Sequence, residues 1–164
     1  MTENKTDIRE KTCFFTGHRD IPQDKLVEIQ SKLEKAIISL IVKGVIYYAV
    51  GGAVGFDTIA TLTILKLKSK YPKLKLVMIL PCKNHHFSWQ GSDMKIFEGL
   101  KNSADKVVYT AERYYNGCMY KRNRHMAEGS RYCICYQTAS TGGTAYTVNY
   151  AKSMGVHLIN IAEE

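Results

Sequence analysis

Six short runs of β-branched, aromatic and aliphatic residues, separated by segments of helical length, constrain most strongly how this chain can fold. Several of these runs are apolar almost continuously rather than at every second position, which is typical of strands covered on both faces of a parallel sheet. The predicted strands are residues 12–16, 45–50, 74–80, 105–110, 131–137 and 157–162.

The segments between these strands carry helical periodicity. One helix face repeats at Leu26, Ile29, Leu33, Ile37 and Leu40. Gly44 follows this segment as a helix-ending residue. Further helices are predicted near residues 56–70, 90–101, 119–129 and 143–154. Because strand and helix alternate along the whole chain, we predict an α/β fold, a three-layer sandwich built on a mostly parallel sheet.

The length and composition fit one domain. The 164 residues are 45% hydrophobic, enough to bury one sizeable core, and no repeat, low-complexity tract or flexible linker divides them. We therefore predict a single domain over residues 1–164, with residues 1–11 as a short N-terminal extension. The polar N-terminus resembles no signal peptide, and no apolar stretch approaches the ~20 residues that span a bilayer. We expect a cytoplasmic protein with no membrane partner.

Charge and cysteine content restrict the class of ligand. The formal net charge of +8 favours anionic partners such as nucleotides, nucleic acids or acidic proteins. Much of that charge is spread along predicted helices, however, where solvated surface explains it without a ligand. The five cysteines lack the paired CxxC spacing of zinc sites, so we predict structural thiols and no metal site.

The stretch "VGGAVGFD" (50–57) places three glycines where a strand turns into a helix. Without a Cβ, Gly51, Gly52 and Gly55 could let backbone amides approach a phosphate or ribose, although a tight turn without a ligand would use the same residues. Gly52 is the position at which we expect a bulky residue to block the ligand. Asp57 falls in the first helical turn, where it could cap the helix or accept a hydrogen bond from a ribose hydroxyl.

Four other segments end at the same predicted edge of the sheet, where α/β folds collect their ligands. These are "TGHR" (16–19), "PCKNHHFSWQ" (81–90), "YKRNRHM" (120–126) and "TASTGGT" (138–144). Arginines could clamp a phosphate, and Arg122 would do so from the start of its helix. The glycine pair could present backbone amides, and Trp89 could stack on a base. The predicted ligand-binding residues are Gly17, His18, Arg19, Gly51, Gly52, Gly55, Asp57, Trp89, Arg122, Asn123, Gly142, Gly143 and Thr144.

Four motifs in a fixed order resemble the SLOG superfamily, named for its Smf/DprA and LOG members, and within it the small YpsA-like proteins. These motifs are "TGHR", "GGAVGFD", Arg122-Asn123 followed by Met126, and "GGTAYTVNYA". The resemblance runs from Thr12 to about Ile161. It implies a Rossmann-like fold and a pocket for nucleotides or nucleotide-derived molecules such as ADP-ribose or NAD-related compounds. We expect no required cofactor.

Whether this pocket is catalytic stays open. LOG-type phosphoribohydrolases carry a Gly-Gly-x-Gly-Thr-x-x-Glu motif, and the resemblance places Asn149 where their glutamate acts on the glycosidic bond. An amide cannot act as a general base. Asp57, Asp93 and Glu128 are the carboxylates that could substitute.

We therefore expect cytoplasmic binding or sensing of a nucleotide or nucleotide-derived ligand by a SLOG domain. Two alternatives from other classes stay open. One is a phosphoribohydrolase-like N-glycosidic hydrolase. The other is a single-stranded nucleic-acid binding protein, which the net charge and the eleven tyrosines allow. The sequence also leaves open a homo-oligomer.

Overall fold

The computed structural model describes residues 5–83 and 91–163 of the chain. The six predicted strands pair in one sheet, and every neighbouring pair runs parallel. The predicted α/β, Rossmann-like fold is therefore confirmed, with a sheet that is parallel at every pairing. The strands are β1 (Thr12–Gly17), β2 (Tyr47–Val50), β3 (Lys75–Leu80), β4 (Lys106–Tyr109), β5 (Tyr132–Tyr136) and β6 (His157–Asn160).

Each predicted helix is also present, with bounds that shift by a few residues. The helices are α2 (Leu26–Val42), α3 (Phe56–Lys68), α4 (Ser92–Ser103), α5 (Cys118–Glu128) and α6 (Gly143–Ser153). A short helix, α1 (Lys5–Glu10), lies in the segment expected as an extension, and a 3-10 turn, η1 (Gln23–Lys25), precedes α2. Within the described ranges, no helix is long and apolar enough to cross a membrane.

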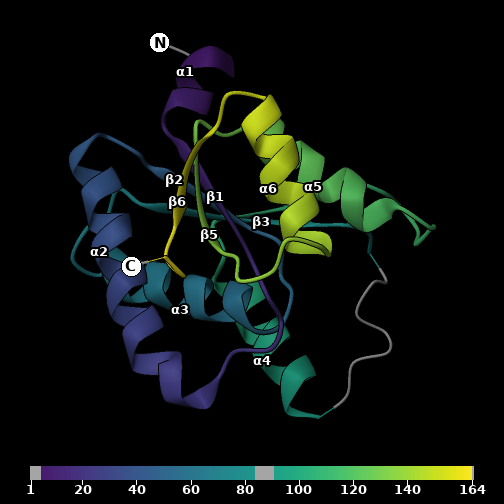
Figure 1. The fold of residues 1–164 in the computed structure, drawn as a ribbon, viewed down its shortest axis with the longest axis horizontal. Coiled ribbons are helices and arrows are strands. Elements are labelled where there is room, and N and C mark those ends of the chain that lie inside the picture. The colour runs from purple at the N-terminus through teal and green to yellow at the C-terminus, as the bar shows by residue number, and fades with distance from the viewer. Residues whose placement is uncertain (1–4, 84–90, 164) are drawn as a thin grey trace.

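Helices cover the two faces of the sheet (Figure 1). Helices α2, α3 and α4 pack on one face through side chains such as Leu33, Ile64 and Phe97. Helices α5 and α6 pack on the other face, where Met126 and Val148 meet the strand residue Phe14. The near-continuous apolar character of the strands follows from this double coverage, because side chains on both faces are removed from water.

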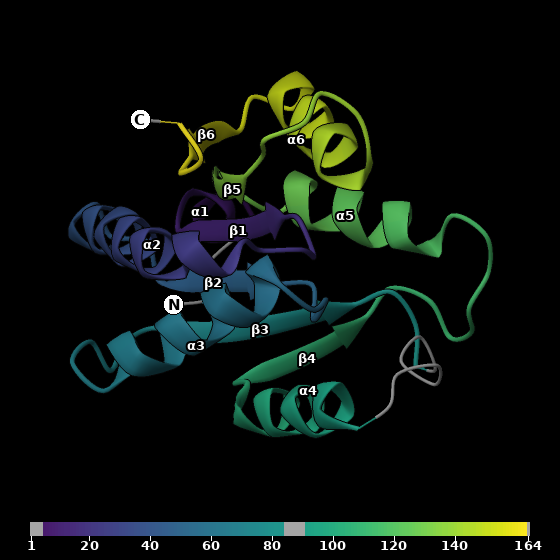
Figure 2. The same ribbon diagram turned by 60° about the horizontal axis from the view of Figure 1, so that its bottom comes forward.

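The strand order β4-β3-β2-β1-β5-β6 reverses once along the chain. The first four strands progress outward to β4, and the chain then returns across the sheet to place β5 on the other side of β1. Figure 2 shows the long connection from β4 back to α5. The loops that follow β1 and β5 leave the sheet in diverging directions, and such a switch point is where open α/β sheets form their binding crevice.

Candidate functional site

A cavity of about 420 Å³, here called the switch-point crevice, lies at the C-terminal ends of β1 and β5. The loops after both strands and the first half of α5 line it. It brings together nine of the thirteen residues that the sequence predicted for ligand binding. These nine are Gly17, His18, Arg19, Asp57, Arg122, Asn123, Gly142, Gly143 and Thr144.

The N-terminus of α6 opens into this crevice. The first hydrogen bond of the helix runs from the N–H of Tyr146 to the carbonyl of Gly142, at 3.0 Å. The helix ladder therefore leaves the N–H groups of Gly143, Thr144 and Ala145 unused. A Cβ added at Gly142 or Gly143 would meet no described atom within 4 Å, so the approach to these donors is open. Free N–H groups at the positive end of a helix are suited to an anion.

His18 ties together the two loops that diverge at the switch point. Its Nε2 accepts a hydrogen bond from the N–H of Thr138 at 2.9 Å, and its ring packs edge-on against Tyr136. His18 thus holds the loop after β1 against the loop after β5 and shapes the crevice between them.

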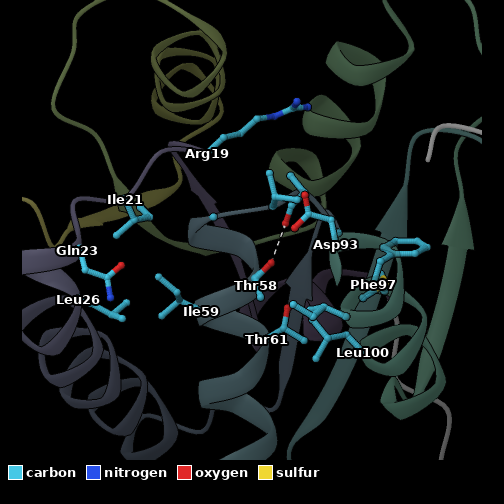
Figure 3. A pocket seen from close by; sticks show the side chains of 16 residues that line it. Arg19, Ile21, Gln23, Leu26, Thr58, Ile59, Thr61, Asp93, Phe97 and Leu100 are labelled. Atoms are coloured by element: carbon cyan, nitrogen blue, oxygen red, sulfur yellow. Dashed lines mark hydrogen bonds between the residues drawn. The ribbon is translucent and has the colours of Figure 1, made fainter. Parts of the chain in front are cut away.

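Arg19 is the exposed cation of the crevice. No hydrogen bond or ion pair from the described part of the chain holds its guanidinium. Arg19 also lines the neighbouring cavity drawn in Figure 3, where its side chain extends from the loop after β1. A guanidinium without a fixed partner at the edge of an anion site can close on a phosphate in a bidentate manner.

Arg122 occupies a different place from the one predicted. It lies in the second turn of α5 rather than at the helix start, and only 4% of it is exposed. Its Nη1 donates to the carbonyl of Gly51 and, at 3.3 Å, to that of Ile79. The guanidinium therefore anchors the glycine turn after β2 to α5 and to β3.

Asp57 closes the same turn from the other side. Its carboxylate accepts hydrogen bonds from the N–H groups of Gly51 at 3.2 Å and Ala53 at 3.3 Å. Burial raises the pKa of Asp57, against the opposing effects of Arg122 and these two donors. A buried carboxylate engaged in this way positions the backbone, so the ribose-binding role considered from the sequence has no support in these contacts.

Asn123 gains a defined orientation from its neighbour. The Nε–H of Arg122 donates to Oδ1 of Asn123 at 2.7 Å. The side-chain oxygen is therefore occupied, and the amide offers its NH₂ group to the crevice that it lines. That group donates and so suits the acceptor oxygens of a phosphate or a sugar.

Three predicted glycines are required by packing. A Cβ at Gly17 would lie 2.5 Å from the ring of Phe56, and one at Gly51 would lie 2.6 Å from Nη1 of Arg122. Gly52 has φ +75° and directs its Cβ position toward Leu80, at 2.7 Å. The prediction that a bulky residue at Gly52 would act mainly on the ligand is therefore wrong, since the added side chain would enter the core.

A second cavity, of about 300 Å³, lies on the other side of the glycine turn (Figure 3). Residues of η1, α3 and α4 line it, including the apolar Ile59, Phe97 and Leu100. Gly52 and Gly55 belong to this cavity, while Gly51 lines neither. Because the free amides of α6 do not reach it, it is the weaker candidate for an anionic ligand.

The residues that the sequence analysis considered for catalysis do not come together at one place in the structure. Asn149 is exposed on α6 and does not line the crevice, because the buried face of that helix carries Thr144, Thr147 and Val148 instead. The structure therefore gives Asn149 no place in the crevice. Asp93 lines the second cavity, and Glu128 accepts a hydrogen bond from the hydroxyl of Tyr150. Of the described residues around the crevice, Asp57 is the sole carboxylate.

The structure also brings tyrosines to the crevice that the sequence analysis did not select. Tyr114 and Tyr120 line it and are 60% and 45% exposed. The sequence analysis assigned base stacking to Trp89, which lies outside the described residues. The available signal was the polar segment "ERYYNGCMY" (112–120), in which tyrosines recur just before and inside the helix at the switch point.

Comparison with known proteins agrees with this fold. The YpsA family model, described as the YspA SLOG family, matches residues 14–160. A UPF0398 protein of Halalkalibacterium halodurans is 26% identical over 142 residues, covering 85% of this chain and 72% of that protein. The SPbeta prophage-derived protein YoqJ of Bacillus subtilis is 27% identical over 140 residues, covering 77% of this chain and 82% of its own.

Two solved structures share the fold. DNA processing protein A from Streptococcus pneumoniae superposes with a TM-score of 0.66 at 15% identity, covering 92% of this chain. The structure of DNA processing protein A from Helicobacter pylori, described for its single-stranded DNA binding mode, gives 0.64 at 20% identity, covering 94%. The chain spans 50% and 66% of these two proteins, so the likeness concerns one part of each.

Proposed function

Because the chain belongs to the YspA SLOG family, we propose that its switch-point crevice binds a nucleotide or a nucleotide-derived molecule through a phosphate. The observation that carries the proposal is the N-terminus of α6, where the helix ladder leaves three backbone N–H groups unused and Gly142, Gly143 and Thr144 line the cavity. Arg19 adds a charged donor at the edge, and Asn123 adds an oriented amide.

Binding or sensing fits these residues better than hydrolysis. Cleavage of an N-glycosidic bond needs an acid or base beside the reacting atoms. Asp57 is the carboxylate among the described residues that line the crevice, and it already accepts hydrogen bonds from two backbone N–H groups. A chromatographic search for free base after incubation with nucleoside monophosphates or NAD tests this step, and robust turnover would contradict the binding-only proposal.

Replacing Gly143 by proline is expected to weaken phosphate binding without unfolding the protein. Proline suits the first position of a helix, where its missing N–H is not needed by the ladder. It would remove one donor from the anion site, and a charge-assisted hydrogen bond is worth about 1.5–3 kcal/mol, so affinity should fall about 10- to 100-fold. Calorimetric titration with adenosine 5′-monophosphate measures the change.

The matched control is Gly143→Ala, which keeps the N–H and adds its Cβ to open space. We expect its affinity to stay closer to that of the parent. Both variants should melt within a few degrees of the parent. Equal affinities of the proline, alanine and parent proteins would exclude the helix N-terminus as the phosphate site.

Binding of single-stranded nucleic acid is a second candidate function. The shared fold with a DNA processing protein A described for single-stranded DNA binding favours it, together with the net charge of +8. Aromatic side chains at the crevice rim could stack on successive bases. Here a strand would lie along the surface, whereas a single nucleotide would sit inside the crevice.

A salt titration separates the two candidates. If the chain tracks a phosphate backbone, the affinity for a labelled oligothymidylate should fall steeply with salt, with a slope of about −0.7 per neutralised phosphate. Fluorescence anisotropy between low and physiological salt measures the slope. A flat response, or the same affinity for the oligonucleotide as for a mononucleotide, would count against a nucleic-acid groove.

A further inference from the structure

Exposed aromatic side chains gather at one rim of the switch-point crevice. Tyr114, before α5, and Tyr120, in its first turn, both line the cavity, and close to half or more of each side chain is exposed. Tyr146 of α6 adds a third ring, 38% exposed. Tyrosines exposed beside a cavity present a flat apolar surface with a polar tip, which is the chemistry that a base needs for stacking.

The ring of Tyr120 packs against the ring of Tyr146. Its centroid lies 4.6 Å from that of Tyr146, with the ring planes at 68°. The hydroxyl of Tyr146 in turn accepts a hydrogen bond from Nη1 of Arg124 at 3.0 Å. Because packing on Tyr146 restricts the ring of Tyr120, a ligand that stacks on Tyr120 loses less side-chain entropy than it would on an unrestrained ring.

This aromatic rim stands close to the phosphate donors. Tyr146 follows Gly142 by one turn of α6, about 6 Å along the helix axis, and Tyr120 packs on Tyr146. A sugar fills an interval of this size between the phosphate and the base of a nucleotide. The oriented NH₂ group of Asn123 lines the same crevice and can donate to a sugar hydroxyl or a carbonyl oxygen.

We propose that Tyr120 stacks on the base of the bound ligand, so that the crevice selects nucleoside phosphates over sugar phosphates that lack a base. This inference rests on the proposed function, since it assigns the base position of the same site. It identifies the ligand class by chemistry: a phosphate at the N-terminus of α6, and a planar heterocycle against the tyrosine rim.

The test compares ligands with and without a base. Calorimetric titrations are made on the parent and on Tyr120→Leu. The ligands are adenosine, guanosine, cytidine and uridine 5′-monophosphates, and ribose 5-phosphate. The parent should bind at least one nucleotide more than about tenfold more tightly than ribose 5-phosphate. Tyr120→Leu should lose most of this preference while its affinity for ribose 5-phosphate stays unchanged.

Two further variants complete the experiment. Tyr115→Leu removes a tyrosine of the same 45% exposure that does not line the crevice, and it should bind like the parent. Tyr120→Phe keeps the ring and should retain the preference. A parent that binds none of these ligands contradicts the proposed function itself. A parent that binds ribose 5-phosphate as tightly as every nucleotide, or a Tyr120→Leu variant that keeps its preference, overturns this inference alone.

Discussion

Replacing Arg122 by alanine should lower the free energy of unfolding by about 3–5 kcal/mol, because it removes the buried positive charge that offsets the buried carboxylate of Asp57 and leaves two backbone carbonyls without their donor. The guanidinium donates to the carbonyls of Gly51 and Ile79 and offsets the buried carboxylate of Asp57. All three groups would lose a partner at once. Urea denaturation followed by circular dichroism measures the change.

Arg124→Ala is the control for this variant. It removes an arginine from the same helix that donates to the hydroxyl of Tyr146 at the surface, so little stability should be lost. If the two alanine variants unfold at the same urea concentration, Arg122 is not the anchor of the glycine turn. A double variant with Asp57→Asn should recover part of the loss from Arg122→Ala, because the uncompensated charge is then absent.

The loss in Arg122→Ala should also depend on pH. Burial already raises the pKa of Asp57, and removing Arg122 takes away an opposing effect, so the folded-state pKa rises further. A group whose folded pKa is raised contributes stability below its unfolded pKa of about 3.9 and loses it as pH rises through the folded value. The difference between variant and parent should therefore shrink as the pH is lowered from 7 toward 4.5.

The fold could be predicted from the sequence because the relevant signals are local. A parallel strand buried on both faces, such as β3, must be apolar almost throughout, and a helix such as α2 must repeat its apolar residues at helical spacing. The order of strands was not available from these patterns. It depends on the side of β1 on which the chain places β5 after β4, and neither the loop after β4 nor the helical spacing of α5 specifies that side.

The site was predicted in composition but only partly in the role of each residue. Proximity to the sheet edge correctly brought Gly142, Gly143 and Arg19 to one crevice. Arg122 does not take its predicted role, because its position on α5 turns the guanidinium inward. Which side of a helix faces the sheet is a property of the tertiary structure. Asn149 faces solvent for the same reason.

The tyrosine rim could not be assigned from spacing alone. Tyr120 and Tyr146 are 26 residues apart in the sequence and meet because α5 and α6 pack side by side. In the sequence, each tyrosine taken alone has the pattern of an ordinary surface residue. The proposed base subsite depends on the two tyrosines lying together beside a helix N-terminus. That arrangement arises only when the two helices pack on the sheet.

Replacing Gly55 by alanine is the other change from which we expect a large effect. Gly55 has φ +85°, and a Cβ there would lie 2.2 Å from the carbonyl oxygen of Arg19. Backbone strain of about 1–3 kcal/mol and overpacking of a similar size should together lower the free energy of unfolding by about 2–6 kcal/mol. The obstructing atoms belong to the main chain, so a rotamer change cannot relieve the contact.

Gly142→Ala separates the two causes. Gly142 also has a positive φ, +101°, but its Cβ would meet no described atom within 4 Å, so this variant carries the strain without the contact. Thermal melting of both variants should place Gly55→Ala clearly below Gly142→Ala. If Gly55→Ala unfolds at the same temperature as Gly142→Ala, the close approach of the glycine turn to Arg19 does not limit stability. If it melts lower, the loop carrying Arg19 must move to admit the methyl group, and phosphate affinity should fall in the same variant because that loop forms one side of the crevice.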